Sequence, residues 1–501
     1  MKYLSLLTVV PLLGALAVAF VPRTKPELAK RLALLTSLAV LGLAVATWFA
    51  FEAGGERLQL RESYAWIPAW DAKFTFAVDG ISLVMLILTA LLVPIVILAS
   101  WRDLDSGKRS VPAYFALILA LEGTMIGTFA AADVLLFYLF FEVMLVPMYF
   151  LIGSFGQDVP TKQRHYAAVK FFLYSLVGGL VMLAAVVGLW VAGGKTFDWA
   201  TLLSADFSNG AERWLFLGFF LAFAIKAPFF PFHTWLPDAG GAAPAGAAVL
   251  LVGVMDKVGT YGILRYCLPL FPEASRYFAP LAIALSLVGI IYAALLAVGQ
   301  HDLKRLVSYT SIAHFGFIGI GIFAFTLQAG SGAVLYMVNH GLATGLLFLV
   351  VGMFVSRRGS TLIGDFGGAG KLVPVLAGVF FFAGLASLSL PGLGPYVSEF
   401  LVLIGVFAVN KTVAVIATFG MILGAAYVLW MIQRTTQGTL NPALTKVDGM
   451  RRDLTKREMV IVAPLIALLL VFGFYPKPLL DVINPAVEAT LSDVKVVEAG
   501  K

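Results

Sequence analysis

Cysteine and charged residues are scarce in this sequence. Its 501 residues include one cysteine, and 13% of them are charged, whereas soluble proteins carry about 25% charged residues. A single cysteine excludes a disulfide framework, a cysteine-ligated iron–sulfur cluster and a Cys-x-x-Cys redox pair. The low charge excludes a cytosolic enzyme built from several soluble domains.

Apolar residues are abundant instead and make up 60% of the chain. Because a helix that crosses a bilayer needs about 20 mostly apolar residues, the sequence predicts an all-α polytopic membrane protein with about 14 transmembrane helices. The predicted spans lie near residues 3–22, 32–51, 79–101, 112–130, 132–153, 166–192, 214–236, 243–267, 279–299, 306–326, 332–356, 373–409, 412–433 and 459–476. The first span also has features of a signal peptide, but a second span follows it directly, so we expect it to be retained.

The positive charges are unevenly distributed between the connections. With the N-terminus outside, 20 of the 35 Lys and Arg residues fall on the cytoplasmic side and 12 on the other. The positive-inside rule therefore places both termini on the outer side of a bacterial plasma membrane. This bias accounts for the net charge of +7, so we expect no nucleic-acid partner.

A carboxylate lies midway through one predicted span. Glu142, in Phe137-Tyr-Leu-Phe-Phe-Glu142-Val-Met, has no charged neighbour within eight residues. A charge at the bilayer centre costs roughly 2.5–3.5 kcal/mol on insertion scales, so an ionisable residue there is functional by default. The alternative is a structural carboxylate that is hydrogen-bonded within the bundle.

The seventh predicted span is interrupted directly after a lysine. Lys226 opens the segment Lys226-Ala-Pro228-Phe-Phe-Pro231-Phe-His-Thr-Trp-Leu-Pro237. Three prolines within ten residues exclude a regular helix, and exposed backbone at membrane depth is tolerated only where it is buried in protein or lines a wet cavity. Transporters build ion sites beside such breaks. Alternatively, the lysine extends to the membrane surface.

A second break occurs in the twelfth span, at Pro391-Gly-Leu-Gly394-Pro395, and Glu399 follows it. This acid is either functional or faces solvent at a span end. The two breaks are five spans apart, so the broken helices run in opposite directions. This pattern predicts two inverted five-helix repeats, spans 4–8 and 9–13, with spans 7 and 12 discontinuous. We therefore divide the chain into an N-terminal three-helix segment, the first repeat, the second repeat, and a C-terminal helix and tail: 1–111, 112–267, 268–433 and 434–501.

Other ionisable residues inside spans are Lys257, His314 and His340. Each histidine is a candidate proton carrier or simply a satisfied core residue. Asp256 precedes Lys257, but adjacent residues on an α-helix do not face each other, so structural pairing and function remain open for Asp256. Lys170 lies a few residues into its span and is expected to extend to the membrane surface.

Four sequence segments together resemble the antiporter-like subunits of respiratory complex I, over residues 75–475. They are Phe137-Tyr-Leu-Phe-Phe-Glu142-Val-Met-Leu-Val-Pro147-Met-Tyr, Lys226-Ala-Pro-Phe-Phe-Pro-Phe-His-Thr-Trp-Leu-Pro-Asp-Ala239, Asp302-Leu-Lys-Arg-Leu-Val-Ser-Tyr-Thr-Ser-Ile-Ala-His314, and Leu390-Pro-Gly with Glu399.

The resemblance implies a fourteen-helix core with a proton path. Position by position, it implies that Glu142 and Lys226 are the glutamate–lysine pair and Lys257 the central lysine. It further implies that His314 and His340 bridge to an exit residue, Glu399. It implies no cofactor in this chain, with FMN and iron–sulfur clusters in partner subunits, and flanking partners that are the antiporter-like subunits L and N.

Glu399 favours one branch of this family, because subunits L and N and the related sodium/proton antiporter subunits usually carry lysine there. The chain also lacks the long amphipathic C-terminal helix typical of subunit L. It departs from the family after Asp238-Ala239, where Gly240 stands in place of a usual histidine. That departure removes one expected group for cytoplasmic-side proton entry.

A change of distance alone can load and release a proton in such a pair. At an effective dielectric near 20, unit charges interact by about 4 kcal/mol at 4 Å and about 1.7 kcal/mol at 10 Å. We therefore expect a proton to pass from Lys226 through Lys257 and water near the two histidines to Glu399. The sequence holds no dinucleotide or haem motif to drive this movement, so partners must supply the energy.

Three other functions compete with a redox-driven pump. The nearest is a subunit of a multi-subunit sodium/proton antiporter or of a membrane-bound hydrogenase. A stand-alone solute carrier lacks support, because the buried ionisable residues suit only protons. A structural scaffold explains the apolar spans but gives no reason for Glu142, Lys226 and Lys257 to lie within them.

Overall fold

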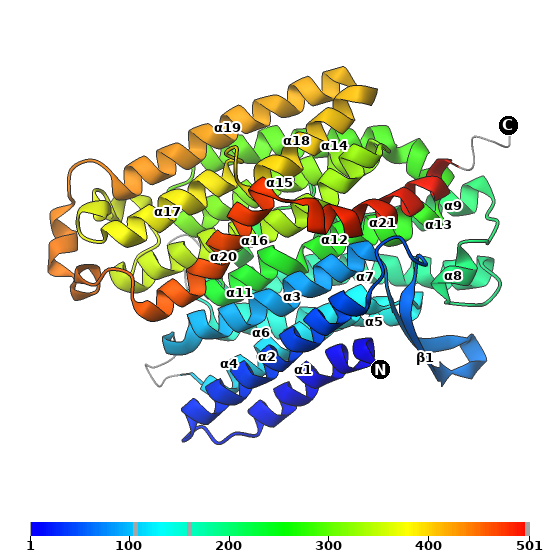
Figure 1. Cartoon of the computed structure of the whole chain (residues 1–501), viewed down its shortest axis with the longest axis horizontal. Coiled ribbons are helices and arrows are strands. Elements are labelled where there is room, and N and C mark those ends of the chain that lie inside the picture. Colours follow the sequence, from blue (N-terminus) through cyan, green and yellow to red (C-terminus); the bar gives the residue numbers. More distant parts are fainter. Residues whose placement is uncertain (1, 104–108, 158–162, 496–501) are drawn as a thin grey trace.

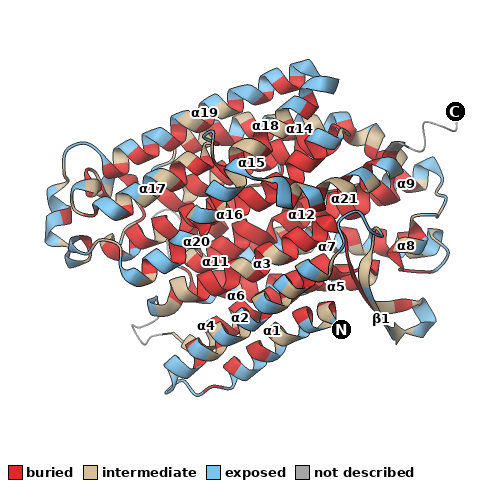
Figure 2. Cartoon of the chain, in the orientation of Figure 1, coloured by how far each residue is buried: buried red, intermediate tan, exposed pale blue. Residues whose placement is uncertain are grey.

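The protein is a bundle of long helices that lie side by side (Figure 1). The structure is a computed structural model that describes residues 2–103, 109–157 and 163–495. Helices α1 and α2 form one edge of the bundle in Figure 1 and α19 the opposite edge. Helices α11, α12 and α16 lie between them, where Figure 2 shows the largest concentration of buried residues.

The N-terminal segment is a helical pair, a β-hairpin and a third helix. Its elements are α1 (Tyr3–Ala19), α2 (Pro26–Ala50), β1 (Gln59–Ile67), η1 (Pro68–Trp70), β2 (Ala72–Val78), α3 (Gly80–Ala99) and η2 (Ser100–Arg102). The antiparallel β1–β2 hairpin was not predicted from the sequence, because the search for apolar spans passes over short strands outside the membrane. Asp79 begins α3 by accepting a hydrogen bond from the Ser82 N–H.

The next segment contains the first broken helix. Its elements are α4 (Val111–Ala130), α5 (Val134–Val143), α6 (Leu145–Phe155), α7 (Arg164–Ala192), α8 (Trp199–Leu202), α9 (Asn209–Lys226) and α10 (Leu236–Ala242). Helices α5 and α6 form one span that is interrupted at Met144. Pro147 lacks the N–H that would bond to the Val143 carbonyl, which explains the interruption. Between α9 and α10 the chain makes irregular turns, as the three prolines predict.

The following span is a buried helix with two wide, π-helical turns. It consists of α11 (Ala245–Leu250), η3 (Leu251–Met255), α12 (Lys257–Gly262), η4 (Ile263–Cys267) and α13 (Leu268–Leu270). The Asp256 N–H bonds to the Leu251 carbonyl, five residues back, rather than to the carbonyl of Val252. Such π-helical turns are rare and often mark functional sites.

The second half contains the second broken helix. Its elements are α14 (Pro272–Val298), α15 (Leu303–Phe323), α16 (Leu327–Arg358), η5 (Ile363–Asp365), η6 (Ala369–Lys371), α17 (Pro374–Ser387), α18 (Gly394–Val409) and α19 (Lys411–Thr436). The break between α17 and α18 includes two residues in the left-handed region, Ser389 (φ 60°) and Gly392 (φ 93°). Prolines therefore interrupt the first broken span, and prolines with glycines interrupt the second, as predicted.

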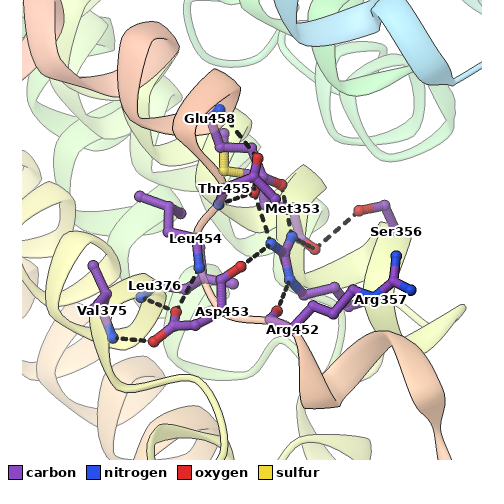
Figure 3. Close-up of polar contacts among 10 residues, drawn as sticks. All are labelled: Met353, Ser356, Arg357, Val375, Leu376, Arg452, Asp453, Leu454, Thr455 and Glu458. Carbon is purple, nitrogen blue, oxygen red and sulfur yellow. Dashed lines mark hydrogen bonds and ion pairs between the residues drawn. The ribbon is translucent and has the colours of Figure 1, made fainter.

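The C-terminal segment crosses one face of the bundle (Figure 1). It comprises η7 (Pro442–Lys446), η8 (Asp448–Arg451), α20 (Lys456–Phe474) and α21 (Lys477–Lys495). Figure 3 shows how it is attached: both guanidinium ends of Arg357 on α16 donate to Glu458 on α20, each at 2.8 Å. Asp453 accepts hydrogen bonds from the Val375 and Leu376 N–H groups at the start of α17. The sequence did not predict α21, a helix with many charged residues that buries Ile483 and Val487.

Within the described residues, eleven helices are long and apolar enough to cross a membrane. The number rises to twelve if the bent pair Ile363–Lys371 and Pro374–Ser387 counts as one span. The other predicted spans correspond to the short α1 and to the two interrupted helices, α9–α10 and α17–α18. The chain is therefore a multi-pass helical membrane protein.

Candidate proton-relay site

The Glu142 carboxylate lies at the flank of the bundle but turns inward. The residue is half-buried, and its neighbours on the outer face of α5, Leu139 and Val143, are exposed. Its Oε1 atom is buried and has no hydrogen-bond partner among the described residues. Glu142 is therefore neither a lipid-facing group nor a carboxylate fully satisfied by the bundle.

Glycine makes room for this carboxylate. On α7, a Cβ atom added to Gly179 would overlap the carboxyl group of Glu142, and one added to Gly178 would press against Ile225 of α9. The glycine pair thus lets α7 approach both the acid-bearing helix and the lysine-bearing helix. Two adjacent glycines in an apolar span were a sequence signal for this close packing.

Lys226 ends α9, directly before the first break. Its side chain is 1% exposed, and Nζ lies 4.8 Å from the ring centroid of Phe141 and 6.0 Å from that of Phe171. In the part of the chain that the structure describes, Nζ has no hydrogen-bond partner. Lys226 interacts electrostatically with Glu142 without a direct hydrogen bond, so the two charges are coupled but separated.

The turns after Lys226 are fixed by backbone and indole hydrogen bonds. The Trp235 indole N–H donates to the Ile225 carbonyl at 2.9 Å, and the Phe229 N–H donates to the Ala224 carbonyl at 2.9 Å. These bonds satisfy carbonyl groups that the broken helix leaves without their usual partners. The lysine is therefore held at the end of α9 and does not extend to the membrane surface.

Lys257 is enclosed by polar partners at the centre of the bundle. It is fully buried, and its Nζ lies 3.1 Å from Asp256 Oδ1 and 2.6 Å from His340 Nδ1. It also donates to the Val252 carbonyl. The π-helical turn makes the Val252 carbonyl available to the ammonium group, because the Asp256 N–H bonds to Leu251 instead.

The two predicted histidines come together beside Lys257. His314 on α15 and His340 on α16 are buried, and their ring centroids are 5.2 Å apart. The Tyr336 ring lies 5.7 Å from that of His314. Among the described residues, His340 Nε2 and His314 Nδ1 have no hydrogen-bond partner, so each ring keeps a nitrogen for a proton or a water molecule.

Glu399 on α18 is 3% exposed and accepts a hydrogen bond from the Tyr336 hydroxyl at 3.3 Å. One turn further along α16, the Asn339 amide donates to the Gly394 carbonyl at 2.9 Å and to the Ser398 hydroxyl at 2.8 Å. These bonds attach the start of α18 to α16. Tyr336 and Asn339 were not predicted as site residues, because neutral polar residues in an apolar span carry no strong signal.

Lys170, which the sequence predicts to extend to the membrane surface, also bonds to the protein. Its ammonium group donates to the Thr234 carbonyl and to Asp238, each at 2.8 Å. Asp238 also pairs with Arg305 at 2.5 Å. Lys170 therefore links α7 to the first break and, through Asp238, to α15.

Gly240 lies where α10 packs closely against α15. A Cβ atom added at this position would overlap the Ser308 hydroxyl on α15. A larger residue at 240 would therefore have to displace that hydroxyl.

Comparison with known proteins places the chain among respiratory membrane subunits. The model of a family described as "NADH:quinone oxidoreductase/Mrp antiporter, TM" matches residues 131–424. NADH-quinone oxidoreductase subunit M of Mycobacterium tuberculosis is 46% identical over 528 residues, which cover 98% of this chain and 94% of the relative. NADH-ubiquinone oxidoreductase chain 4 of Arabidopsis thaliana is 39% identical over 488 residues, covering 97% of this chain and 96% of the relative.

Solved structures agree with these relatives. A chain of respiratory complex I from Thermus thermophilus with bound NADH superimposes with a TM-score of 0.88 at 29% identity, covering 98% of this chain and 99% of that chain. A chain of the Mrp complex from Dietzia sp. superimposes with a TM-score of 0.84 at 21% identity, covering 100% and 99%. The second likeness shows a shared fold.

Proposed function

Because the chain belongs to the NADH:quinone oxidoreductase/Mrp antiporter family of membrane proteins, we propose that it moves protons through a relay of buried acids, amines and imidazoles. It does so as a membrane subunit of a proton-translocating NADH:quinone oxidoreductase, complex I, the enzyme named for its relatives in bacteria and plants. Its partners are other complex I subunits.

The relay begins at Glu142 and Lys226. Lys226 is buried and coupled electrostatically to Glu142, but no direct bond fixes the distance between their charged groups. A movement that separates unit charges from 4 Å to 10 Å weakens their attraction by about 2 kcal/mol at an effective dielectric near 20. Such a movement changes how firmly the amine holds its proton.

The observation that carries the proposal is the chain of contacts around Lys257. Its Nζ lies 2.6 Å from His340 Nδ1, the His340 and His314 rings are 5.2 Å apart, and Tyr336 next to His314 bonds to Glu399. All these groups are buried in a membrane bundle, where unneeded ionisable residues are costly. A proton passes from Lys226 through Lys257 and the two imidazoles to Glu399.

The energy for this movement comes from outside the chain. FMN and iron–sulfur clusters lie in partner subunits, and the antiporter-like subunits L and N flank this one. Both termini face the outer side of a bacterial plasma membrane, where the relay releases its protons. Fewer Lys and Arg residues on that face support this orientation.

A sodium/proton antiporter subunit is the second candidate, because the fold also matches a chain of the Mrp complex. Glu399 favours complex I. Proton pumping that requires sodium ions and proceeds without NADH would favour the antiporter instead.

The test replaces Lys226 with alanine in the complete complex, reconstituted in vesicles. NADH-driven proton uptake should be lost, while electron transfer from NADH to an artificial acceptor should persist, because the redox centres lie elsewhere. Lys30→Ala is the matched control. Lys30 is also buried, but it pairs with Glu27 on α2 at 2.9 Å, so pumping should be unchanged. Proton uptake by Lys226→Ala at the wild-type rate would refute the relay.

A further inference from the structure

Asp256 is a buried carboxylate that the relay described above does not use. The residue is fully buried, and its Oδ1 atom lies 3.1 Å from Lys257 Nζ. Oδ2 is buried as well and has no hydrogen-bond partner within the described ranges. A carboxylate that served only to anchor a lysine would normally have both oxygens satisfied, because an unpaired buried acceptor is costly.

The lysine side chain folds back to reach the adjacent acid. On a regular α-helix, neighbouring side chains point about 100° apart and do not face each other. Here the wide turn at Leu251–Met255 ends directly at Asp256 and leaves the Val252 carbonyl free to accept from the lysine. The ammonium group therefore lies over Val252 and Asp256, where it also contacts the carboxylate.

Asp256 also lies near the end of the helix that carries the other relay lysine. A Cβ atom added to Gly259, one turn after Asp256, would overlap the Phe223 carbonyl and the Ala227 N–H, which lie on either side of Lys226 in the chain. The Asp256 carboxylate is thus close enough to interact electrostatically with Lys226 as well as with Lys257. The other buried carboxylate near this span, Asp79, is already paired with Arg265 at 2.7 Å. Asp256 is therefore the described acid positioned to act on both amines.

We propose that Asp256 carries the proton between Lys226 and Lys257, a role that rests on the proposed relay function. The ammonium of Lys226 releases a proton to the Asp256 carboxylate, which leaves a neutral amine and a neutral carboxylic acid. The acid then gives this proton to a neutral Lys257, and the carboxylate is restored. One proton enters and one leaves, and no other bond is formed or broken.

The experiment measures proton pumping per electron transferred, in vesicles that contain the whole complex. Asp256→Asn should reduce pumping at least tenfold at a normal content of assembled complex, because an amide cannot take up the proton. Asp256→Glu keeps an acid at the site and should retain pumping within about threefold of wild type. Glu212→Gln is the matched control: Glu212 near the start of α9 is buried, but it accepts hydrogen bonds from the Glu273 and Ala274 N–H groups. An amide oxygen can accept these bonds as well, so this variant should pump normally.

Two results would overturn the inference. One is Asp256→Asn pumping within twofold of wild type. The other is a loss confined to the amount of assembled complex, with normal pumping per complex, which is the signature of a purely structural acid. If Lys226→Ala abolishes pumping while Asp256→Asn does not, the relay stands and only the role of Asp256 is wrong. If Lys226→Ala pumps normally, the proposed function itself fails.

Discussion

The two lysines of the relay occupy contrasting surroundings. Lys226 ends a broken helix, and its ammonium group lies near two aromatic rings and has no hydrogen-bond partner among the described residues. Lys257 lies within a buried helix and contacts a carboxylate, a carbonyl and an imidazole. The first amine therefore has no direct polar bond in the described structure, whereas the second has three.

This difference separates two tasks. The Glu142–Lys226 pair can respond to small movements of α5 or α9, because its interaction energy depends on the distance between two charged groups that no direct bond holds together. A bonded cluster keeps its geometry and offers a continuous route for a proton. In the proposed relay, the first lysine would therefore be the adjustable element and the second would be part of a fixed route for the proton.

The largest expected effect comes from breaking the fixed cluster. His340→Ala removes the imidazole in contact with Lys257 and should reduce NADH-driven proton pumping about tenfold. His314→Ala removes a ring that lies beside His340 and Tyr336 and has no hydrogen bond to Lys257 among the described contacts, and it should reduce pumping about threefold. Initial rates of proton uptake in vesicles measure both variants. Equal losses in the two variants would show that direct contact with Lys257 has no special importance.

A smaller effect is expected from disturbing the adjustable pair. Gly179→Ala adds a Cβ where the Glu142 carboxyl group lies, so it should displace the acid and reduce pumping about threefold. Gly188→Ala on the same helix is the control, since its Cβ would meet a single side-chain atom of Leu215 at 3.1 Å. Similar pumping by the two variants would mean that the position of Glu142 is not critical.

The smallest effect concerns the attachment of α5, which carries Glu142. Asp133 accepts hydrogen bonds from the N–H groups of Leu136 and Lys73 at 3.0 and 3.1 Å. Losing such a helix cap costs about 1 kcal/mol, so Asp133→Ala should lower the thermal stability of the subunit without abolishing pumping. The midpoint temperature for loss of pumping measures this change. An unchanged midpoint would mean that the cap does not stabilise α5.

The same residue gives this stability a pH dependence. Burial raises the pKa of Asp133 to about 6, above the value of about 3.9 expected in an unfolded chain. The native state then holds this proton more firmly, so the contribution of Asp133 to stability falls as pH rises from about 4 to about 6. Asp133→Asn should remove that dependence while keeping an acceptor oxygen.

Much of the fold was predictable because the membrane penalises polar groups and broken backbone. Long apolar stretches predicted the helices, and clusters of proline and glycine predicted the breaks after Lys226 and before Glu399. The β1–β2 hairpin and α21 were missed, since they are not apolar spans.

The predicted relay residues remain predictions, although the structure brings several of them together. Lys257, His314 and His340 meet at the centre of the bundle, and each stood out as an ionisable residue in an apolar span. The links made by Tyr336 and Asn339 could not be found in this way, because their meaning depends on which helices face each other. Asp256 was left undecided, because α-helical geometry turns it away from Lys257, and the folding back of the lysine side chain cannot be read from the sequence.

The wide turn at Leu251–Met255 decides which way the residues after it face. A π-helical turn holds one residue more than the α-helical turn it replaces, so the helix beyond it keeps its direction although the chain is one residue longer. If the same residues wound as a regular α-helix, everything after the extra residue would be rotated by about 100°. Lys257 would then point away from His340 although every ionisable group was still present. The relay can therefore be disconnected by a change in helix winding that leaves its ionisable residues unchanged.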